Sequence, residues 1–200
     1  MKDYISIPKK IIADIDIYAF NKYDGQQVRA LWTRKNGIER FGTKNRLLGT
    51  DQADFLQEAP ELIKSKYENT ITDFLKKKGH ISASLFLEFY GENSFAGQHK
   101  QEKHNVILFD IAIDKQEILE PNELIKLEKY NIEVCPLLYY GKANSIFEES
   151  VRNSTLEGMS LEGVVCKGKR DKKTKIPVMF KIKTRAWLEK LKEFCGQDNK

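Results

Sequence analysis

The sequence predicts an α+β fold with mostly antiparallel sheets and flanking helices. Several short β-type segments are joined by turn residues, and helical periodicity is confined to a few other segments. Strands and helices do not alternate regularly, as they would in a parallel βαβ sheet. With 200 residues, 40% of them hydrophobic, the chain is long enough to bury a core of its own.

The first half of the chain is predicted to be rich in strands. Residues 11–20 alternate Asp with apolar residues and read as a strand that ends in a turn at K-Y-D-G. Asn36-Gly37 between two β-rich segments indicates a hairpin. Residues 60–78 carry apolar side chains at helical spacing, and Gly79 ends this predicted helix. Strands are predicted to follow at 81–90 and 106–113.

The second half mixes short helices with further strands. Pro121 is typical of the first position of a helix, here predicted over 121–130. The remaining elements are predicted, in order, as a strand near 134–140, a helix near 145–155, strands at 163–167 and 178–183, and a helix over 186–194.

Composition excludes several classes of protein. The longest apolar run has four residues, so no segment is predicted to span a membrane, and the N-terminus lacks the apolar stretch of a signal peptide. The three cysteines form no C-x-x-C pair and the histidines form no metal-type cluster, which favours reduced thiols in a cytoplasmic protein without structural zinc. P-loop, G-x-G-x-x-G and G-x-S-x-G motifs are absent.

Positive charge is concentrated near the C-terminal end. Between Lys167 and Arg185, nine lysines and arginines stand against Asp171 alone, which gives this segment a charge of +8. The whole chain carries +5, so the remainder carries −3. Such a block favours a polyanionic partner, because phosphate neutralisation dominates affinity for nucleic acids. A solvated, lysine-rich hairpin is the alternative interpretation.

One short motif has the residues of a reactive site. In K-Y-D-G, Lys22 stands where a strand ends in a tight turn, and Gly25 lets the backbone turn closely. A lysine there can project its amine from a rigid scaffold into a pocket. The motif is short enough to occur by chance, and taken alone it favours a hairpin turn with an exposed lysine.

Further motifs follow K-Y-D-G in a fixed order. They are R-F-G-T-K at 40–44, L-F-L-E-F-Y-G at 85–91, L-F-D-I at 108–111, L-E-G-V-V at 161–165 and F-K-I-K at 180–183. The ordered set resembles the covalent nucleotidyltransferase superfamily of ATP-dependent ligases and mRNA capping enzymes. It is most similar to the RNA ligase branch, in which a lysine pair precedes W-L, here Trp187-Leu188. The resemblance covers residues 11–191 and implies a ligase-type nucleotidyltransferase (ATP-grasp-like) fold.

The resemblance implies roles for individual residues. Lys22 would attack the α-phosphate of ATP and form a lysyl-AMP intermediate. Glu162 would lie near the metal, Mg²⁺ or Mn²⁺, and the α-phosphate, which Lys181 and Lys183 would contact. The other implied nucleotide-binding residues are Asn21 and Asp24 beside the lysine, Arg29 for the triphosphate or a 5′-phosphate, Lys44 as a further cation, Glu88 for the ribose and Phe109 for the adenine.

Elementary chemistry agrees with the central roles. A lysine amine is nucleophilic only when neutral, and neighbouring cations favour the neutral form. Lys181 and Lys183 alternate along a predicted strand, so both amines should lie over one face and offset charge in the transition state.

Some assignments keep alternatives open. Phe109 could be an ordinary core residue, and Glu88 a charge at a strand edge. Glu92 competes with Glu88 for the ribose. Asn21 stands where some RNA ligases carry Glu, and its amide could contact either adenine or guanine.

The functional prediction is an ATP-dependent RNA ligase that joins 5′-phosphate and 3′-OH ends. The alternatives are a minimal DNA ligase, a GTP-using capping-type guanylyltransferase, and a non-catalytic nucleic-acid-binding module. Segment 167–175 is the predicted contact for the nucleic-acid backbone. We expect a single nucleotidyltransferase domain over residues 1–200, without a C-terminal OB-fold or other appended domain. A partner protein could supply the missing domain.

Overall fold

The computed structural model describes residues 3–44, 46–48, 55–92, 101–114, 118–171 and 177–197. It contains two four-stranded sheets with the strand orders β3-β2-β4-β5 and β6-β1-β7-β8, and every strand pair is antiparallel. This confirms the predicted α+β class. The chain divides into two compact units, each with one sheet. The first unit takes in described residues of 1–5, 25–92 and 101–134, and the second takes in those of 6–24 and 135–200.

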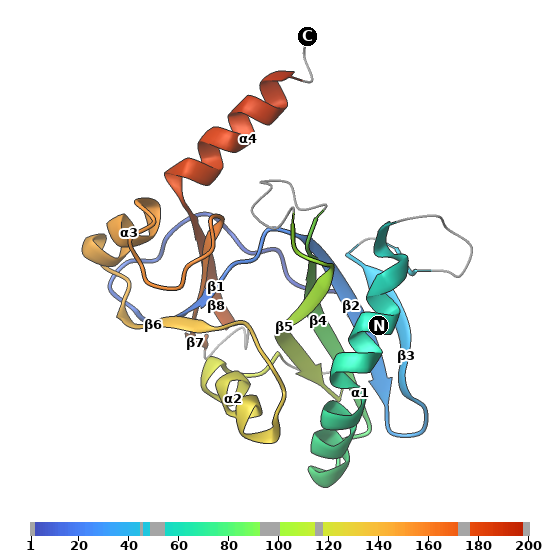
Figure 1. The fold of residues 1–200 in the computed structure, drawn as a ribbon. Coiled ribbons are helices and arrows are strands. Elements are labelled where there is room, and N and C mark those ends of the chain that lie inside the picture. Colours follow the sequence, from blue (N-terminus) through green and yellow to red (C-terminus); the bar gives the residue numbers. More distant parts are fainter. Residues whose placement is uncertain are drawn as a thin grey trace. The chain divides into compact units, whose positions relative to one another are not determined.

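The first unit is a sheet covered by a long helix. Its elements are β2 (Gln26–Thr33), β3 (Gly37–Thr43), a 3₁₀ turn at Phe55–Glu58, α1 (Ala59–Lys77), β4 (Ser82–Tyr90), β5 (Asn105–Ile113), α2 (Pro121–Ile125) and a 3₁₀ turn at Lys126–Tyr130. The predicted hairpin at Asn36-Gly37 joins β2 and β3, and Gly37 has a φ of 70°. Helix α1 lies along the sheet in Figure 1.

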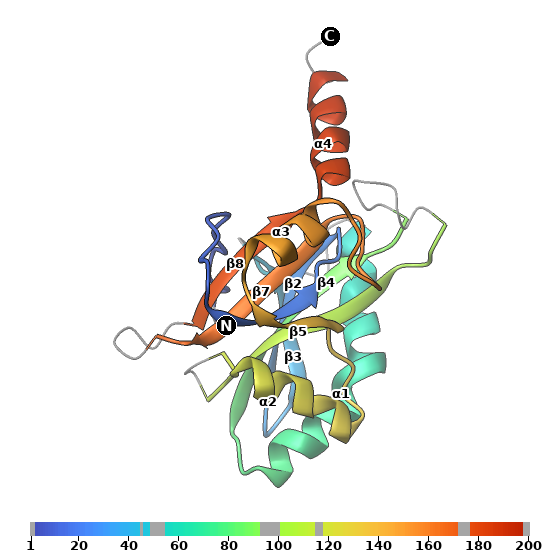
Figure 2. The ribbon, with the colours of Figure 1, turned by 90° about the vertical axis from the view of Figure 1, so that its left-hand side faces the viewer.

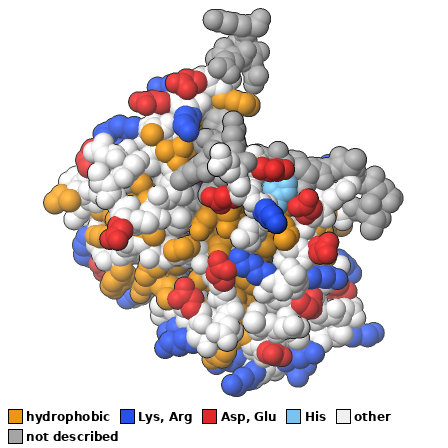
Figure 3. Space-filling view, viewed as in Figure 1, with side chains coloured by type: hydrophobic (Ala, Val, Ile, Leu, Met, Phe, Trp, Pro, Cys, Tyr) orange, Lys and Arg blue, Asp and Glu red, His pale blue; other side chains and the backbone are white. Residues whose placement is uncertain are grey.

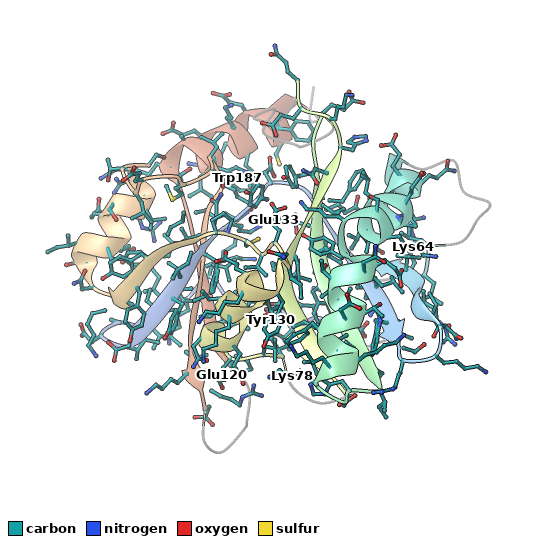
Figure 4. The ribbon with its side chains drawn as sticks, turned by 60° about the horizontal axis from the view of Figure 1, so that its bottom comes forward. Lys64, Lys78, Glu120, Tyr130, Glu133 and Trp187 are labelled. Atoms are coloured by element: carbon teal, nitrogen blue, oxygen red, sulfur yellow. The ribbon has the colours of Figure 1, made fainter. Side chains whose placement is uncertain are left out.

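Hydrogen bonds from buried aromatic side chains tie α1 to its surroundings. The Trp32 indole on β2 donates to the Thr72 hydroxyl of α1 (2.9 Å). The Tyr67 hydroxyl accepts from the backbone N–H of Leu108 on β5 (3.0 Å). Tyr130, labelled in Figure 4, packs edge-on against Phe74 of α1 at 4.9 Å between ring centroids. These contacts fix which face of the first sheet α1 covers.

The second unit carries its sheet against a short helix. Its elements are β1 (Asp16–Asn21), β6 (Leu137–Lys142), α3 (Ser145–Arg152), β7 (Gly163–Arg170), β8 (Pro177–Lys183) and α4 (Arg185–Gln197). One face of the sheet packs on α3, which Figure 2 shows in front of β7 and β8. The buried core of this face consists of Ile17, Ala19, Val164, Cys166, Phe180 and Ile182 from the strands, with Ala143, Phe147 and Val151.

Several element bounds differ from the prediction. The first strand begins at Asp16 rather than at residue 11, because Asp14 has a φ of 60° and so cannot continue an extended strand. Strand β7 extends to Arg170, since pairing with β8 continues through Lys167 to the Arg170–Pro177 pair. Helix α3 ends at Arg152, and Asn144 caps its start by accepting from the Phe147 N–H (2.9 Å).

Some large apolar side chains stay exposed on the second unit. Figure 3 shows hydrophobic side chains around the position of β6, where Leu137 is 38% and Tyr140 is 62% exposed. Among the residues that the structure describes, no helix has the length and apolar character needed to cross a membrane.

Candidate active site

The backbone on both sides of Lys22 is held by neighbouring segments. Lys22 follows β1, and its N–H donates to the Gly163 carbonyl at 3.0 Å, which continues the pairing of β1 with β7. The Ser160 hydroxyl donates to the Lys22 carbonyl. The Ser160 N–H in turn donates to the side-chain oxygen of Asn21 at 2.8 Å. The root of the Lys22 side chain is therefore fixed by the loop that precedes β7.

Glu162 bridges two of the predicted site lysines. One carboxylate oxygen lies 2.8 Å from Lys22 Nζ, and the other lies 2.9 Å from Lys183 Nζ. The Glu162 side chain is 5% exposed, whereas those of Lys22 and Lys183 are 20% and 16% exposed. A buried carboxylate requires such charged partners. The structure thus brings Lys22 into contact with Glu162, 140 positions later in the sequence, and places Lys183 on the same carboxylate.

Lys181 completes a positively charged group around Lys22. On β8, Phe180 and Ile182 lie in the buried core, so Lys181 and Lys183 lie on the opposite face, as the alternation predicted. Burial, followed by repulsion from Lys22 and Lys183, lowers the pKa of Lys181. Burial also lowers the pKa of Lys183, although Glu162 opposes this shift. With the three lysines protonated, the four side chains carry a net charge of +2.

This excess charge should cost folding stability at neutral pH. We expect Lys181→Met to raise the free energy of unfolding by about 0.5–1 kcal/mol, a small value because Lys181 is partly solvated. The folded-state pKa lies below that of the unfolded chain, so the wild type gains stability as pH rises between the two values. The advantage of the variant should therefore shrink at alkaline pH. Urea unfolding of the wild type and of Lys181→Met at neutral and at alkaline pH measures the difference in free energy of unfolding.

The control for that experiment is Lys142→Met. Lys142 is exposed on β6 and paired with Asp16 at 3.0 Å, so its removal relieves no repulsion among site lysines. A Lys181→Met protein that is no more stable than the wild type at neutral pH would contradict the prediction.

Four other predicted site residues lie in the first unit. Gln27 and Arg29 on β2 pair with Glu88 and Phe86 on β4, which puts Arg29 and Glu88 on one face of the sheet. Trp32 has the opposite orientation and contacts α1, so α1 covers the other face. Arg29 is 7% exposed and forms an ion pair with Asp3.

Phe109 occupies a β-bulge in β5. Its neighbours Leu108 and Asp110 pair with the consecutive residues Leu87 and Phe86, so Phe109 is the additional residue. The half-buried ring lies 5.0 Å from the Tyr4 ring and 6.5 Å from that of Phe86. Stacking of Phe109 on adenine stays a prediction.

The last predicted residues lie at turns. Lys44 is exposed after β3, and Asp24 is 5% exposed. Gly25 passes so near β4 that a Cβ there would lie 2.2 Å from the Phe89 carbonyl oxygen, which agrees with the close turn predicted for this glycine. Glu92 is exposed beyond the end of β4, whereas Glu88 lies within that strand. Binding of the ribose by Glu88 stays a prediction.

The basic segment 167–175 is described only as far as Asp171. Lys167 is 2% exposed, and its ammonium lies 4.9 Å from the centroid of the Phe20 ring. It is therefore not the surface contact for phosphate that the sequence predicted. Lys169 is exposed and Arg170 is half-buried. Residues 172–175 lie outside the described residues.

Sequence patterns did not predict two residues whose hydrogen bonds position the backbone near Lys22 and Glu162. Ser160 contacts Asn21 and Lys22, and Thr184 donates to the Leu161 carbonyl at 2.5 Å. A signal existed for Thr184, since a threonine directly before a helix is a common N-cap. Ser160 offers no comparable signal, because its partners are about 140 residues away.

Glu162 is the carboxylate of the site that could hold a divalent cation. No group of three or more His, Cys, Asp or Glu side chains suited to a metal occurs in the described part of the chain. Magnesium commonly uses one or two carboxylates and takes its other ligands from water and phosphate. The residues present therefore fit a cation that is bound together with a phosphate substrate.

The two antiparallel sheets with their flanking helices agree with the ligase-type nucleotidyltransferase fold that the sequence motifs imply. A family model described as RNA ligase matches residues 15–183, and the chain belongs to that family. No curated protein matches the chain.

Solved structures of a Naegleria gruberi RNA ligase share the fold. A mutant with ATP and manganese has a TM-score of 0.64 and 22% identity, covering 90% of this chain and 52% of that one. The ligase with pyrophosphate has a TM-score of 0.65 and 20% identity, covering 90% and 53%. The present chain thus spans about half the length of these proteins.

Proposed function

We propose that this protein is an ATP-dependent RNA ligase that acts through a lysyl-AMP intermediate on Lys22. The observation that carries the proposal is the buried Glu162 carboxylate with Lys22 on one oxygen and Lys183 on the other, beside Lys181. The excess of positive charge suits a polyphosphate, and a lysine within it suits covalent chemistry. Membership of the RNA ligase family supports the same activity.

In the first step the Lys22 amine attacks the α-phosphorus of ATP. A bond forms between Nζ and phosphorus, the bond from phosphorus to the bridging oxygen of the β-phosphate breaks, and pyrophosphate leaves with that electron pair. The amine releases its protons to solvent. Glu162 positions the amine before the reaction, and the charges of Lys181 and Lys183 lower the cost of deprotonating it.

The remaining residues neutralise and orient the nucleotide. Lys181 and Lys183 contact the α-phosphate, where they offset the charge of the transition state. A divalent cation, Mg²⁺ or Mn²⁺, would supply further neutralisation of the triphosphate, with Glu162 as its protein ligand. In the first unit, Arg29, Glu88 and Phe109 are proposed to bind phosphate, ribose and adenine. Asn21, Asp24 and Lys44 complete the proposed nucleotide-binding set.

The AMP group then passes to the 5′-phosphate of RNA, and a 3′-OH attacks that activated phosphate and releases AMP. Lys169 and Arg170 are the described residues of the basic segment that we propose to contact the RNA backbone. We propose that residues 1–200 form a single nucleotidyltransferase domain. The three free cysteines suit the reducing cytoplasm.

The test is to incubate the protein with divalent metal and α-labelled ATP or GTP and to separate it under denaturing conditions. We expect a label from ATP that survives denaturation and is lost in acid, as a phosphoramidate is, and that peptide mapping assigns to Lys22. RNA and DNA strands with 5′-phosphate and 3′-OH ends are then compared for joining, with RNA preferred. Labelling by GTP alone would indicate a capping-type enzyme, preferred joining of DNA a DNA ligase, and no label a binding module.

A further inference from the structure

The ammonium of Lys183 lies directly over an aromatic ring. Its Nζ is 3.3 Å from the centroid of the Trp187 ring, while the same nitrogen is 2.9 Å from Glu162 Oε1. Trp187 is 6% exposed, in the first turn of α4 near the end of β8 (Figure 4). Lys183 is therefore held between a carboxylate and the electron-rich face of an indole, which is the most favourable ring for binding a cation.

Backbone and hydroxyl contacts join the start of α4, which carries Trp187, to the segment that carries Glu162. The backbone N–H of Trp187 donates to the Thr184 hydroxyl oxygen at 3.0 Å, and that hydroxyl donates to the carbonyl of Leu161 at 2.5 Å. The Thr184 N–H donates to the Glu162 carbonyl at 3.2 Å. Thr184 is fully buried. The start of α4 and the segment that carries Glu162 are thus joined at one residue.

A second attachment holds the first turn of α4 against α3. The Arg185 guanidinium lies 3.1 and 3.0 Å from the two carboxylate oxygens of Glu149, and it also donates to Asn153. Both contacts to Glu149 come from Nη2 of Arg185, and both side chains are about half exposed. They add a second attachment for the turn of α4 that carries Trp187.

An aromatic ring at this position attracts the Lys183 ammonium without changing the net charge of the site. Lys183 has a flexible side chain and is repelled by Lys22, so the ammonium needs a further attractive contact in order to stay in place. A second carboxylate would provide one, but it would lower the net charge that attracts a phosphate. The indole face attracts the ammonium without adding a negative charge to the site.

We propose that Trp187 is a positioning residue, which holds the Lys183 ammonium where it contacts the α-phosphate through a cation–π interaction. The proposal rests on the function proposed above. It assigns a role in the reaction to the start of α4, which lies outside the lysine and glutamate motifs.

Fluorinated tryptophan tests this role because fluorine withdraws electron density from the ring face and changes its size little. The chain has two tryptophans, so Trp32→Phe leaves Trp187 as the only labelled position. We expect the rate of lysyl-AMP formation to fall stepwise with the number of fluorines, by about three- to thirtyfold in total. The matched control is Trp187→Phe with fluorinated Trp32, in which fluorination should leave the rate unchanged.

Unlabelled variants keep the test valid if Trp32→Phe does not fold. In the otherwise unchanged chain, Trp187→Phe should retain more activity than Trp187→Leu, because Phe keeps a ring face. Thermal unfolding identifies any variant that loses activity through misfolding. A rate that is independent of fluorination, or equal rates for Phe and Leu, would overturn the proposal.

A second measurement does not depend on activity. With ¹³C-labelled lysine, the ring current of Trp187 should place the Lys183 ε-CH₂ resonance upfield of those of exposed lysines, and Trp187→Leu should remove this shift. If no lysyl-AMP forms but the ring-current shift is present, the proposed function fails and the contact stands. If labelling is normal but Lys183 shows no ring-current shift, the positioning role fails alone.

Discussion

Replacing Lys22 by alanine is expected to abolish formation of the covalent nucleotide adduct, with a loss of more than about ten-thousandfold. No other amine can take its place, because the lysine is held at a defined position by Gly163, Ser160 and Glu162. Lys183 remains paired with Glu162 in this variant, so the fold should persist. Gel detection of radiolabelled protein measures the loss, and circular dichroism checks the fold.

Lys142→Ala is the matched control for this variant. Lys142 is also an ion-paired lysine of the second sheet, with its ammonium 3.0 Å from Asp16, but it lies on the edge strand β6. It should label at the wild-type rate. An adduct of normal yield in the Lys22→Ala protein would remove Lys22 from the mechanism.

The second large effect is expected from Gly163→Ala. Gly163 has a φ of 126°, and a Cβ at this position would lie 2.1 Å from the backbone oxygen of Ile182 and 3.0 Å from the Lys183 Cα. Neither group can move away without displacing β8. We expect a loss of about 3 kcal/mol or more in unfolding free energy, from backbone strain together with overpacking. Denaturant unfolding followed by circular dichroism measures it.

The same strand offers a control for the added methyl group. In Gly168 of β7 an added Cβ would find its nearest neighbours at 3.4 and 3.5 Å, which are ordinary contacts. Gly168→Ala should change stability by less than about 1 kcal/mol. Equal stability of the two variants would contradict the role given to Gly163.

Gly163→Ala protein that still folds should also lose activity, because the substitution displaces the charged groups of the site. Gly163 follows Glu162 as the first residue of β7, its carbonyl accepts from the Lys22 N–H, and it pairs with Lys183 in the sheet. A shift of about 1 Å at this point would move all three charged groups relative to one another, and such displacements commonly cost about a hundredfold in rate.

Periodicity predicted those parts of the structure that depend on local sequence. The alternation of Lys181, Ile182 and Lys183 correctly predicted which side chains face away from the core. Helix α1 follows from apolar residues at helical spacing and from Gly79, and it was found one residue from the predicted bounds. Asn36-Gly37 fixed the first hairpin because Gly37 adopts a positive φ.

The rest depended on contacts that sequence spacing does not encode. Lys167 belongs to a basic segment, yet it is buried, because its ammonium lies over the ring of Phe20 on the neighbouring strand β1. Ser160 carries no motif, although it holds both Asn21 and Lys22. The contact of Lys183 with Trp187 could not be assigned from W-L alone, because it depends on α4 beginning at Arg185, two residues after the end of β8.

Because Glu162 bridges Lys22 and Lys183, the net charge of the site changes when Lys22 is modified, and so does the attraction of the site for polyanions. Before the reaction, the three lysines outweigh the single carboxylate, and a polyanion is drawn in. A phosphoramidate nitrogen carries no positive charge, so the proposed adduct removes one cation and adds one phosphate anion. The net charge of these four side chains and the bound phosphate then falls from +2 to zero, which weakens the attraction of the side chains for pyrophosphate. Adenylylation of Lys22 would thereby favour release of pyrophosphate and disfavour the reverse reaction.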